Sequence, residues 1–246
     1  MPQNEAVTLQ YKMSKGDEYI YEIRVDSNRQ AEAGATKQQE HDILTMKMSQ
    51  KIMAVNPDGS YNLEMIVEPQ KLSKNGQDVK VDPNQQKVTM KMSKSGEILE
   101  TSLQGPATQP SFPTRPIFIS ETWEGESKVN LQDPTTGQPL PPVALKFIYT
   151  LTGIEKVKGY DCAHIVVKNP ETEISLSQGL SQKISAHGDT FFAHKEGRLV
   201  KSDVQTQITM TLPDGSLHNA IKISVLLIDK PASFSTTSNN EFLISG

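Results

Sequence analysis

Hydrophobic and polar residues alternate with a period of two along most of this chain. Residues 19–25 show the pattern clearly, because Tyr19, Tyr21, Ile23 and Val25 occupy every second position. Successive side chains of a β-strand point to opposite faces, so such a segment has one apolar face and one polar face. The pattern predicts an antiparallel sheet with one face in water. It recurs in residues 44–49, 61–68, 88–93, 204–212 and 221–227.

Glycine-containing turn sequences separate these segments and predict hairpins, because glycine tolerates a positive φ. Examples are Asn56-Pro57-Asp58-Gly59 and Pro213-Asp214-Gly215. Little helix is expected. Residues 27–40 are rich in Ala, Gln and Glu but lack an apolar stripe, and we expect a long, mobile hairpin loop there, with a short helix as the alternative. The pattern of residues 174–184 is compatible with either a strand or a helix.

Three blocks of sequence recur in the same order and indicate two similar halves. Gly96 and Gly197 lie 101 residues apart within matching blocks. We expect an all-β, mainly antiparallel fold whose pseudo-repeated halves form a curved open sheet or a partly open barrel; two packed β domains are the alternative. The expected divisions are an N-terminal tether (1–8), a first β repeat (9–103), a Pro-rich crossover (104–116), a second β repeat (117–230) and a C-terminal tail (231–246).

The composition excludes several classes of protein. The 246 residues carry a net charge of −4, and no run of Lys and Arg suits a nucleic acid or an anionic membrane surface. No apolar run approaches the roughly 20 residues of a transmembrane helix. The single cysteine, Cys162, permits neither an intramolecular disulfide nor a thiolate metal cage.

The polar start of the chain leaves two locations open. The protein is either cytoplasmic or the product of removing an upstream signal peptide. Residues 2–6 have the composition of a short tether before the first strand, which favours the second interpretation. We therefore expect an extracytoplasmic location in the cell envelope, the periplasm or the cell surface, with the signal sequence absent from the given chain.

Several blocks resemble a broad group of uncharacterised exported bacterial proteins and lipoproteins. They are residues 11–19, 118–123, 153–163 and 195–202. The overall plan is similar to that of the LolA/LolB-like lipoprotein carriers. This resemblance implies a strongly curved, unclosed antiparallel sheet with an apolar concave face. The shared blocks are turn and strand signatures, and none is a catalytic signature.

Two groups of residues could carry chemistry. His187, Asp189 and His194 are potential zinc ligands, but their spacing matches no metal motif, so a strand with solvated polar residues is the favoured interpretation. Cys162 and His164 share a strand face and could form a nucleophile pair, although a strand cysteine is more often a small buried hydrophobic residue. We expect no catalytic residue, no metal and no cofactor.

Methionine is concentrated in the first half of the chain, and most of these side chains fall on the inferred apolar face. Methionine is flexible and is frequent at adaptable binding surfaces. These residues either form an ordinary core or line an apolar groove for a lipid or acyl chain. The candidate ligand-binding residues are Met46, Met48, Met65, Met90, Met92, Phe147 and Tyr149.

The leading functional hypothesis is a non-catalytic, exported envelope protein that binds a hydrophobic ligand such as a lipid or acyl chain. A lipid anchor on this protein is left open. A structural or protein-interaction module of the envelope, with other envelope proteins as partners, is the alternative. A hydrolase or metal-dependent enzyme is third, because no constellation of residues supports one.

Overall fold

The computed structural model describes residues 6–82, 84–102, 109–129, 143–176, 180–212 and 214–229. Within these residues the secondary structure is β-strand, without helix, and twelve strands form one sheet in which every pairing is antiparallel. The strands are β1 (Glu18–Ala33), β2 (Thr36–Val55), β3 (Tyr61–Lys74), β4 (Gln77–Val79), β5 (Gln86–Met92), β6 (Ile98–Thr101), β7 (Thr122–Val129), β8 (Val143–Val157), β9 (Tyr160–Ser175), β10 (Ser181–Ala193), β11 (Arg198–Leu212) and β12 (Gly215–Asp229).

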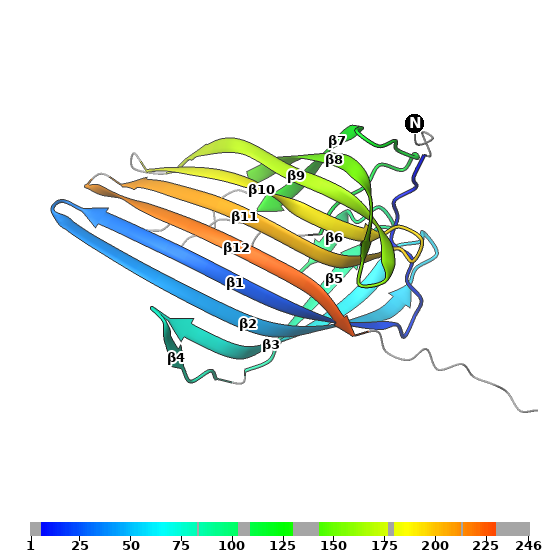
Figure 1. Cartoon of the computed structure of the whole chain (residues 1–246), viewed down its shortest axis with the longest axis horizontal. Coiled ribbons are helices and arrows are strands. Elements are labelled where there is room, and N and C mark those ends of the chain that lie inside the picture. Colours follow the sequence, from blue (N-terminus) through cyan, green and yellow to red (C-terminus); the bar gives the residue numbers. More distant parts are fainter. Residues whose placement is uncertain are drawn as a thin grey trace, which may run out of the picture.

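The sheet is curved and open. Its strand order is β6-β5-β3-β2-β1-β12-β11-β10-β9-β8-β7, with β4 paired to β3 alone. The first and last described strands, β1 and β12, are neighbours at the middle of the sheet, and β6 and β7 are its two edges (Figure 1). The expected all-β, antiparallel, curved open sheet is confirmed. The proposed boundaries of the tether, the two repeats, the crossover and the tail stay predictions, and residues 1–5, 83, 103–108, 130–142, 177–179, 213 and 230–246 lie outside the described residues.

The segment expected as a mobile loop, residues 27–40, is instead the far end of the β1–β2 hairpin. Pairing continues without interruption from Ser27 opposite Asp42 to Ala33 opposite Thr36. The expectation was wrong because this end of the hairpin is polar on both faces, so it lacks alternation. Its cross-strand ion pairs include Arg29 with Glu40 at 3.2 Å.

Residues 174–184, left open between strand and helix, belong to the β9–β10 hairpin. Ile174 is in β9 and Ile184 is in β10, and residues 177–179 between them lie outside the described residues.

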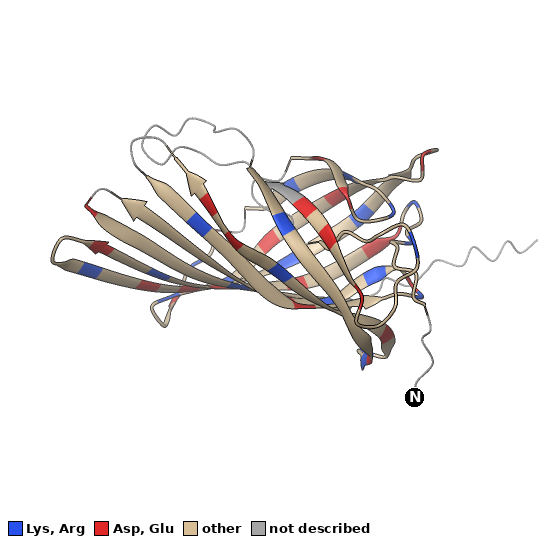
Figure 2. Ribbon diagram, turned by 90° about the horizontal axis from the view of Figure 1, so that it is seen from above, with Lys and Arg blue, Asp and Glu red and all other residues tan. Residues whose placement is uncertain are grey.

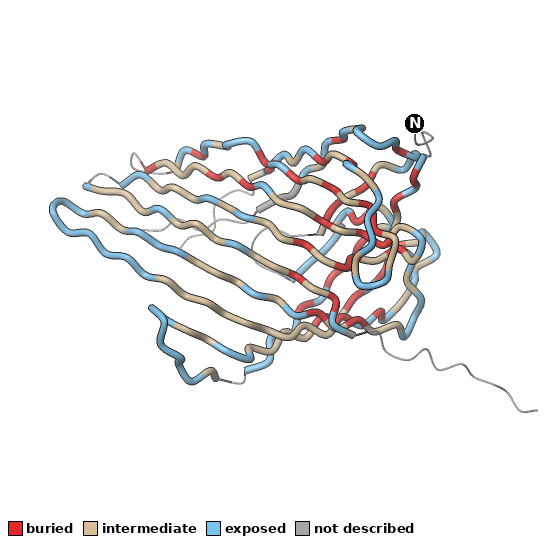
Figure 3. The backbone as a smooth tube through the Cα atoms, viewed as in Figure 1, coloured by how far each residue is buried: buried red, intermediate tan, exposed pale blue. Residues whose placement is uncertain are grey.

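Two non-strand segments fill one end of the curved sheet, opposite the tips of the long hairpins (Figures 1 and 3). Residues 6–17 and 109–121 cross this end, and Val7 pairs with Ile117 in an isolated bridge. Three rings pack together there. The centroid of Phe112 lies 5.5 Å from that of Tyr11 and 4.6 Å from that of Phe192. Most of the buried core gathers at this filled end, as the red segments of Figure 3 show.

The glycines of the matching sequence blocks occupy similar turns. Gly96 lies between β5 and β6 with φ 88°, and Gly197 lies between β10 and β11 with φ 68°. The N-terminal segment contacts both turns. Tyr11 N donates to Lys94 O at 2.8 Å, and Lys12 N donates to Gly197 O at 3.0 Å. One short segment therefore ties together turns from the two halves of the chain.

Candidate functional site: an apolar cavity on the concave face

The apolar positions of neighbouring strands align across the concave face. Ile23 of β1 lies opposite Met46 of β2 on one side and Val225 of β12 on the other. The antiparallel register places the apolar set of each strand beside that of the next, so the apolar face is continuous over many strands. Charged residues of both signs are scattered along the strands without a block of one sign, as the blue and red segments of the ribbon show (Figure 2).

Burial divides the concave face into a closed end and a more open end. Met65, Met90 and Met92 are 5%, 6% and 0% exposed and belong to the main core. Met46 and Met48 lie further along β2 toward the hairpin tip and are only partly buried. Met65, Met90 and Met92 are therefore core residues in this structure, whereas Met46 and Met48 stay partly accessible, and Met48 packs against the edge of the same core.

A cavity of about 80 Å³ opens on the concave face of β8–β12. A void of this size exceeds the space that one water molecule needs. Phe147 and Tyr149 of β8 form part of its wall, and small Ala186 of β10 leaves room within it. All of its described lining residues are uncharged. They are Gln109, Pro110, Leu145, Phe147, Tyr149, Val167, Asn169, Ile184, Ala186, Thr190, Val204, Thr206 and Ile223.

Aromatic packing fixes one wall of this cavity. Trp123 of β7 stacks on Tyr149 with centroids 5.5 Å apart, and its Nε1 donates a hydrogen bond to Ser111 O at 2.8 Å. The Tyr149 hydroxyl hydrogen-bonds to Ser111, but burial raises the pKa of Tyr149. The phenol therefore stays neutral, and the wall carries no charge at physiological pH.

The structure places the sequence-predicted ligand residues in two separate groups. Phe147 and Tyr149 line the cavity. The five methionines of the first half lie on β2, β3 and β5, and none is among the described residues that line it. The seven residues predicted from the sequence therefore lie in two separate places, and their role in ligand binding stays a prediction.

Most residues that line the cavity were not predicted from the sequence. Asn169, Ile184 and Ala186 were not singled out, partly because residues 174–184 were left open between strand and helix. Gln109 and Pro110 fell in a segment treated only as a crossover. The sequence did contain one indication of a cavity. Ala186 and Gly188 occupy successive inward-facing positions of one strand, and both are small where larger apolar residues are usual.

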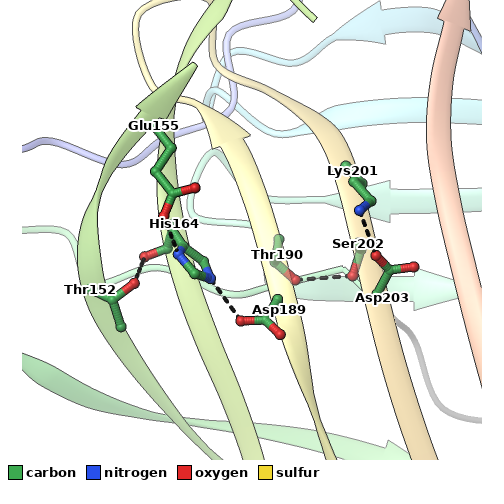
Figure 4. A network of polar contacts seen from close by, with 8 residues as sticks. All are labelled: Thr152, Glu155, His164, Asp189, Thr190, Lys201, Ser202 and Asp203. Atoms are coloured by element: carbon green, nitrogen blue, oxygen red, sulfur yellow. Dashed lines mark hydrogen bonds and ion pairs between the residues drawn. The ribbon is translucent and has the colours of Figure 1, made fainter. Parts of the chain in front are cut away.

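The second half carries a polar network on the opposite, convex face, where Glu155 of β8, His164 of β9 and Asp189 of β10 lie side by side (Figure 4). His164 Nδ1 lies 2.7 Å from Glu155 Oε1, and its Nε2 lies 2.7 Å from Asp189 Oδ1. Burial acts to lower the pKa of His164, but the hydrogen bonds to Asp189 and Glu155 outweigh it and raise the pKa. His164 also stacks on Phe191, with centroids 4.6 Å apart.

The three potential zinc ligands, His187, Asp189 and His194, lie in different environments. Asp189 contacts His164, whereas His187 is exposed, and His194 Nδ1 is buried without a hydrogen-bond partner. Across the described part of the chain, no three His, Cys, Asp or Glu side chains form a group that could hold a metal ion.

Cys162 is fully buried and packs with Ala193 and Val200 in a small cluster. Burial raises the pKa of its thiol to about 11. A nucleophilic cysteine needs a thiolate, so this environment opposes reactivity. His164 shares its strand face but directs both ring nitrogens to carboxylates. The described residues also contain no helix that is both long enough and apolar enough to span a membrane.

Comparison with known proteins gives a likeness of fold. No protein-family model matches this chain. No curated protein matches its sequence. Among solved structures, it is similar to lipovitellin, in a structure concerned with lipid–protein interactions, with a TM-score of 0.50 and 12% sequence identity. The match covers 90% of this chain and 26% of the lipovitellin chain, so the present chain spans about a quarter of that protein. At this identity the comparison shows a shared fold and nothing finer.

Proposed function

We propose that this chain is a non-catalytic protein of the bacterial cell envelope that binds a lipid or another apolar small molecule on the concave face of its sheet. The observation that carries the proposal is the cavity of about 80 Å³ between apolar and uncharged side chains. Pockets for small ligands are typically concave and mostly apolar, with a few polar groups that fix orientation.

The fold supports this assignment in a second way. A solved structure of similar fold, that of lipovitellin, describes lipid–protein interactions in that protein. A curved open sheet with one apolar face leaves accessible apolar surface toward the more open end of its concave face, and a ligand can cover this surface. Each apolar side chain that a ligand removes fully from water contributes about 1.5–3 kcal/mol.

The location in the envelope rests on the resemblance to exported bacterial proteins and LolA/LolB-like carriers. The non-catalytic role rests on the side chains that could have supplied chemistry. Cys162 is buried with a raised pKa, and His164 is held between two carboxylates without an adjacent nucleophile in the described network.

Filling the cavity tests the binding site. Wild-type protein is titrated with Nile red, an uncharged apolar dye, and saturable fluorescence with one site per chain is expected. Ala186→Leu places three further carbon atoms in the cavity and should reduce dye affinity at least tenfold, with the far-UV circular dichroism spectrum unchanged. Ala186 lines the cavity and is 9% exposed, so the added atoms have few other directions.

Ser185→Leu is the matched control. Ser185 is the neighbour of Ala186 in β10, pairs with Gln207 of β11, and points to the opposite face of the sheet. It should leave dye affinity within about twofold of wild type. Absence of saturable binding by the wild type, or equal affinity in wild type and a folded Ala186→Leu variant, would contradict the proposal and favour the structural or protein-interaction role.

A further inference from the structure

Asn169 is a buried amide with one unused hydrogen-bonding atom at the cavity. The residue is 3% exposed, and its Nδ2 donates to Lys146 O at 2.7 Å. This bond fixes the orientation of the amide. Its Oδ1 is buried and has no hydrogen-bond partner. A buried acceptor without a partner is costly, so such a group in a cavity wall indicates an occupant that donates a hydrogen bond.

An irregularity in the sheet places Asn169 there. Ala186 of β10 pairs with Asn169, but Ile184 pairs with Thr172. Two residues of β9 therefore lie opposite one residue of β10, which makes a β-bulge. One of them is Pro170, which has no N–H to contribute to the sheet. β-Bulges often re-aim a side chain beside a functional site.

Gln109 supplies a second acceptor of the same kind. Its Oε1 is also buried and without a partner, and the residue lines the same cavity. Gln109 comes from the segment that crosses the filled end of the sheet, whereas Asn169 comes from a strand. Two amide oxygens without partners, contributed by separate parts of the chain, thus come from residues that line one cavity.

Two hydroxyl groups of the wall already have partners. Thr190 Oγ1 lies 3.0 Å from Ser202 Oγ, and the Tyr149 hydroxyl bonds to Ser111. No cationic side chain occurs among the described residues that line the cavity. A carboxylate or phosphate would therefore enter without a counter-ion and would be repelled by the two amide oxygens, which is unfavourable in a desolvated site.

We infer that the cavity selects an uncharged amphiphile: an apolar chain whose polar end is a hydroxyl group that donates to Asn169 Oδ1 or Gln109 Oε1. This inference rests on the proposed function and specifies the chemical class of its ligand. The hydroxyl lies among the amide oxygens, and the chain follows the apolar residues Val204 and Ile223 along the concave face.

Three ligands with the same eight-carbon chain test this selectivity by displacement of Nile red from the full chain at pH 8. They are 1-octanol, which donates a hydrogen bond; 1-methoxyoctane, which only accepts; and octanoate, which is an anion. Loss of a hydrogen bond to a buried acceptor predicts that 1-methoxyoctane requires an approximately tenfold higher concentration than 1-octanol. Octanoate should be weaker still.

Because either amide oxygen can accept the hydroxyl proton, the double variant Asn169→Leu with Gln109→Leu should bring 1-octanol and 1-methoxyoctane within about twofold of each other. Asn28→Leu, at an exposed position of β1, should keep the wild-type ratio. If the double variant does not fold, the comparison of the three ligands on wild-type protein decides the matter without any variant.

Equal displacement by the alcohol and the ether, or tighter binding of octanoate, would overturn this inference and leave the proposed apolar site standing. Failure of the wild-type protein to bind the dye and all three ligands would overturn both.

Discussion

At the scale of single residues, surroundings decide what each ionisable side chain can do. The Cys162 thiol is kept protonated because burial raises its pKa to about 11. The surroundings of His164 instead favour its charged form, because two carboxylates contact the ring. The sequence showed that Cys162 and His164 share a strand face, but the carboxylate partners come from strands β8 and β10 and could not be assigned without the register.

The raised pKa of His164 predicts a pH-dependent contribution to stability. A group whose pKa is higher in the folded protein stabilises it fully below the unfolded value of about 6.5, and this contribution is lost as pH rises through the folded value. We expect the His164 ion pairs to add up to about 1 kcal/mol near pH 6, because both carboxylates are half exposed. Urea unfolding at pH 6 and pH 9 measures the difference, and an NMR titration of the imidazole gives the pKa.

The control is the double variant Glu155→Gln with Asp189→Asn, which keeps the shape of both partners and removes their charges. Its His164 should titrate below the wild-type value, and its stability should change less between pH 6 and pH 9. A wild-type His164 that titrates at or below 6.5 would show that burial outweighs the carboxylates.

At the scale of elements, alternation predicted the strands wherever one face is buried and the other is wet. It failed where that contrast is absent. Residues 27–40 pair as strands although both faces are polar, and their pairing follows from continuation of the hairpin. The ends of β9 and β10 were ambiguous because a short apolar run without a clear period suits a strand or a helix.

The turn between β5 and β6 should depend on Gly96. Its φ of 88° is strained for any residue with a side chain, and an added Cβ would lie 2.3 Å from Pro110 O and 2.7 Å from the Tyr11 ring. Gly96→Ala should therefore lower the free energy of unfolding by at least about 2 kcal/mol, from the left-handed backbone and the displaced neighbours. Urea denaturation followed by tryptophan fluorescence gives this value.

Gly153 of β8 offers a matched control, since an added Cβ there would meet nothing within 4 Å. Gly153→Ala should remain within about 0.5 kcal/mol of wild type. Equal stability of the two variants would mean that residues 6–17 and 109–121 do not pack against the Gly96 turn as described.

At the scale of the whole molecule, the curved sheet needs something to cover its apolar face. At one end the chain does this itself, with Leu9, Tyr11, Phe112 and Ile117 from two non-strand segments. The sequence predicted an apolar face on the sheet, from the alternation of its strands. It did not show that residues 6–17 supply part of the cover, because their contacts lie far away along the chain. The cavity was hidden for the same reason, since five strands and the crossover each contribute only a few residues.

The measurement that tests the central claim most directly is where an apolar ligand binds. Isoleucine methyl groups label both faces of the sheet. Ile184 and Ile223 line the cavity, whereas Ile148 and Ile228 are 40% and 44% exposed on the convex face. In methyl NMR spectra of the full chain, an uncharged alkyl alcohol at one equivalent should give intermolecular nuclear Overhauser effects to the methyl groups of Ile184 and Ile223 and none to those of Ile148 and Ile228. Effects at the convex pair, or at neither pair at saturating ligand, would contradict the account.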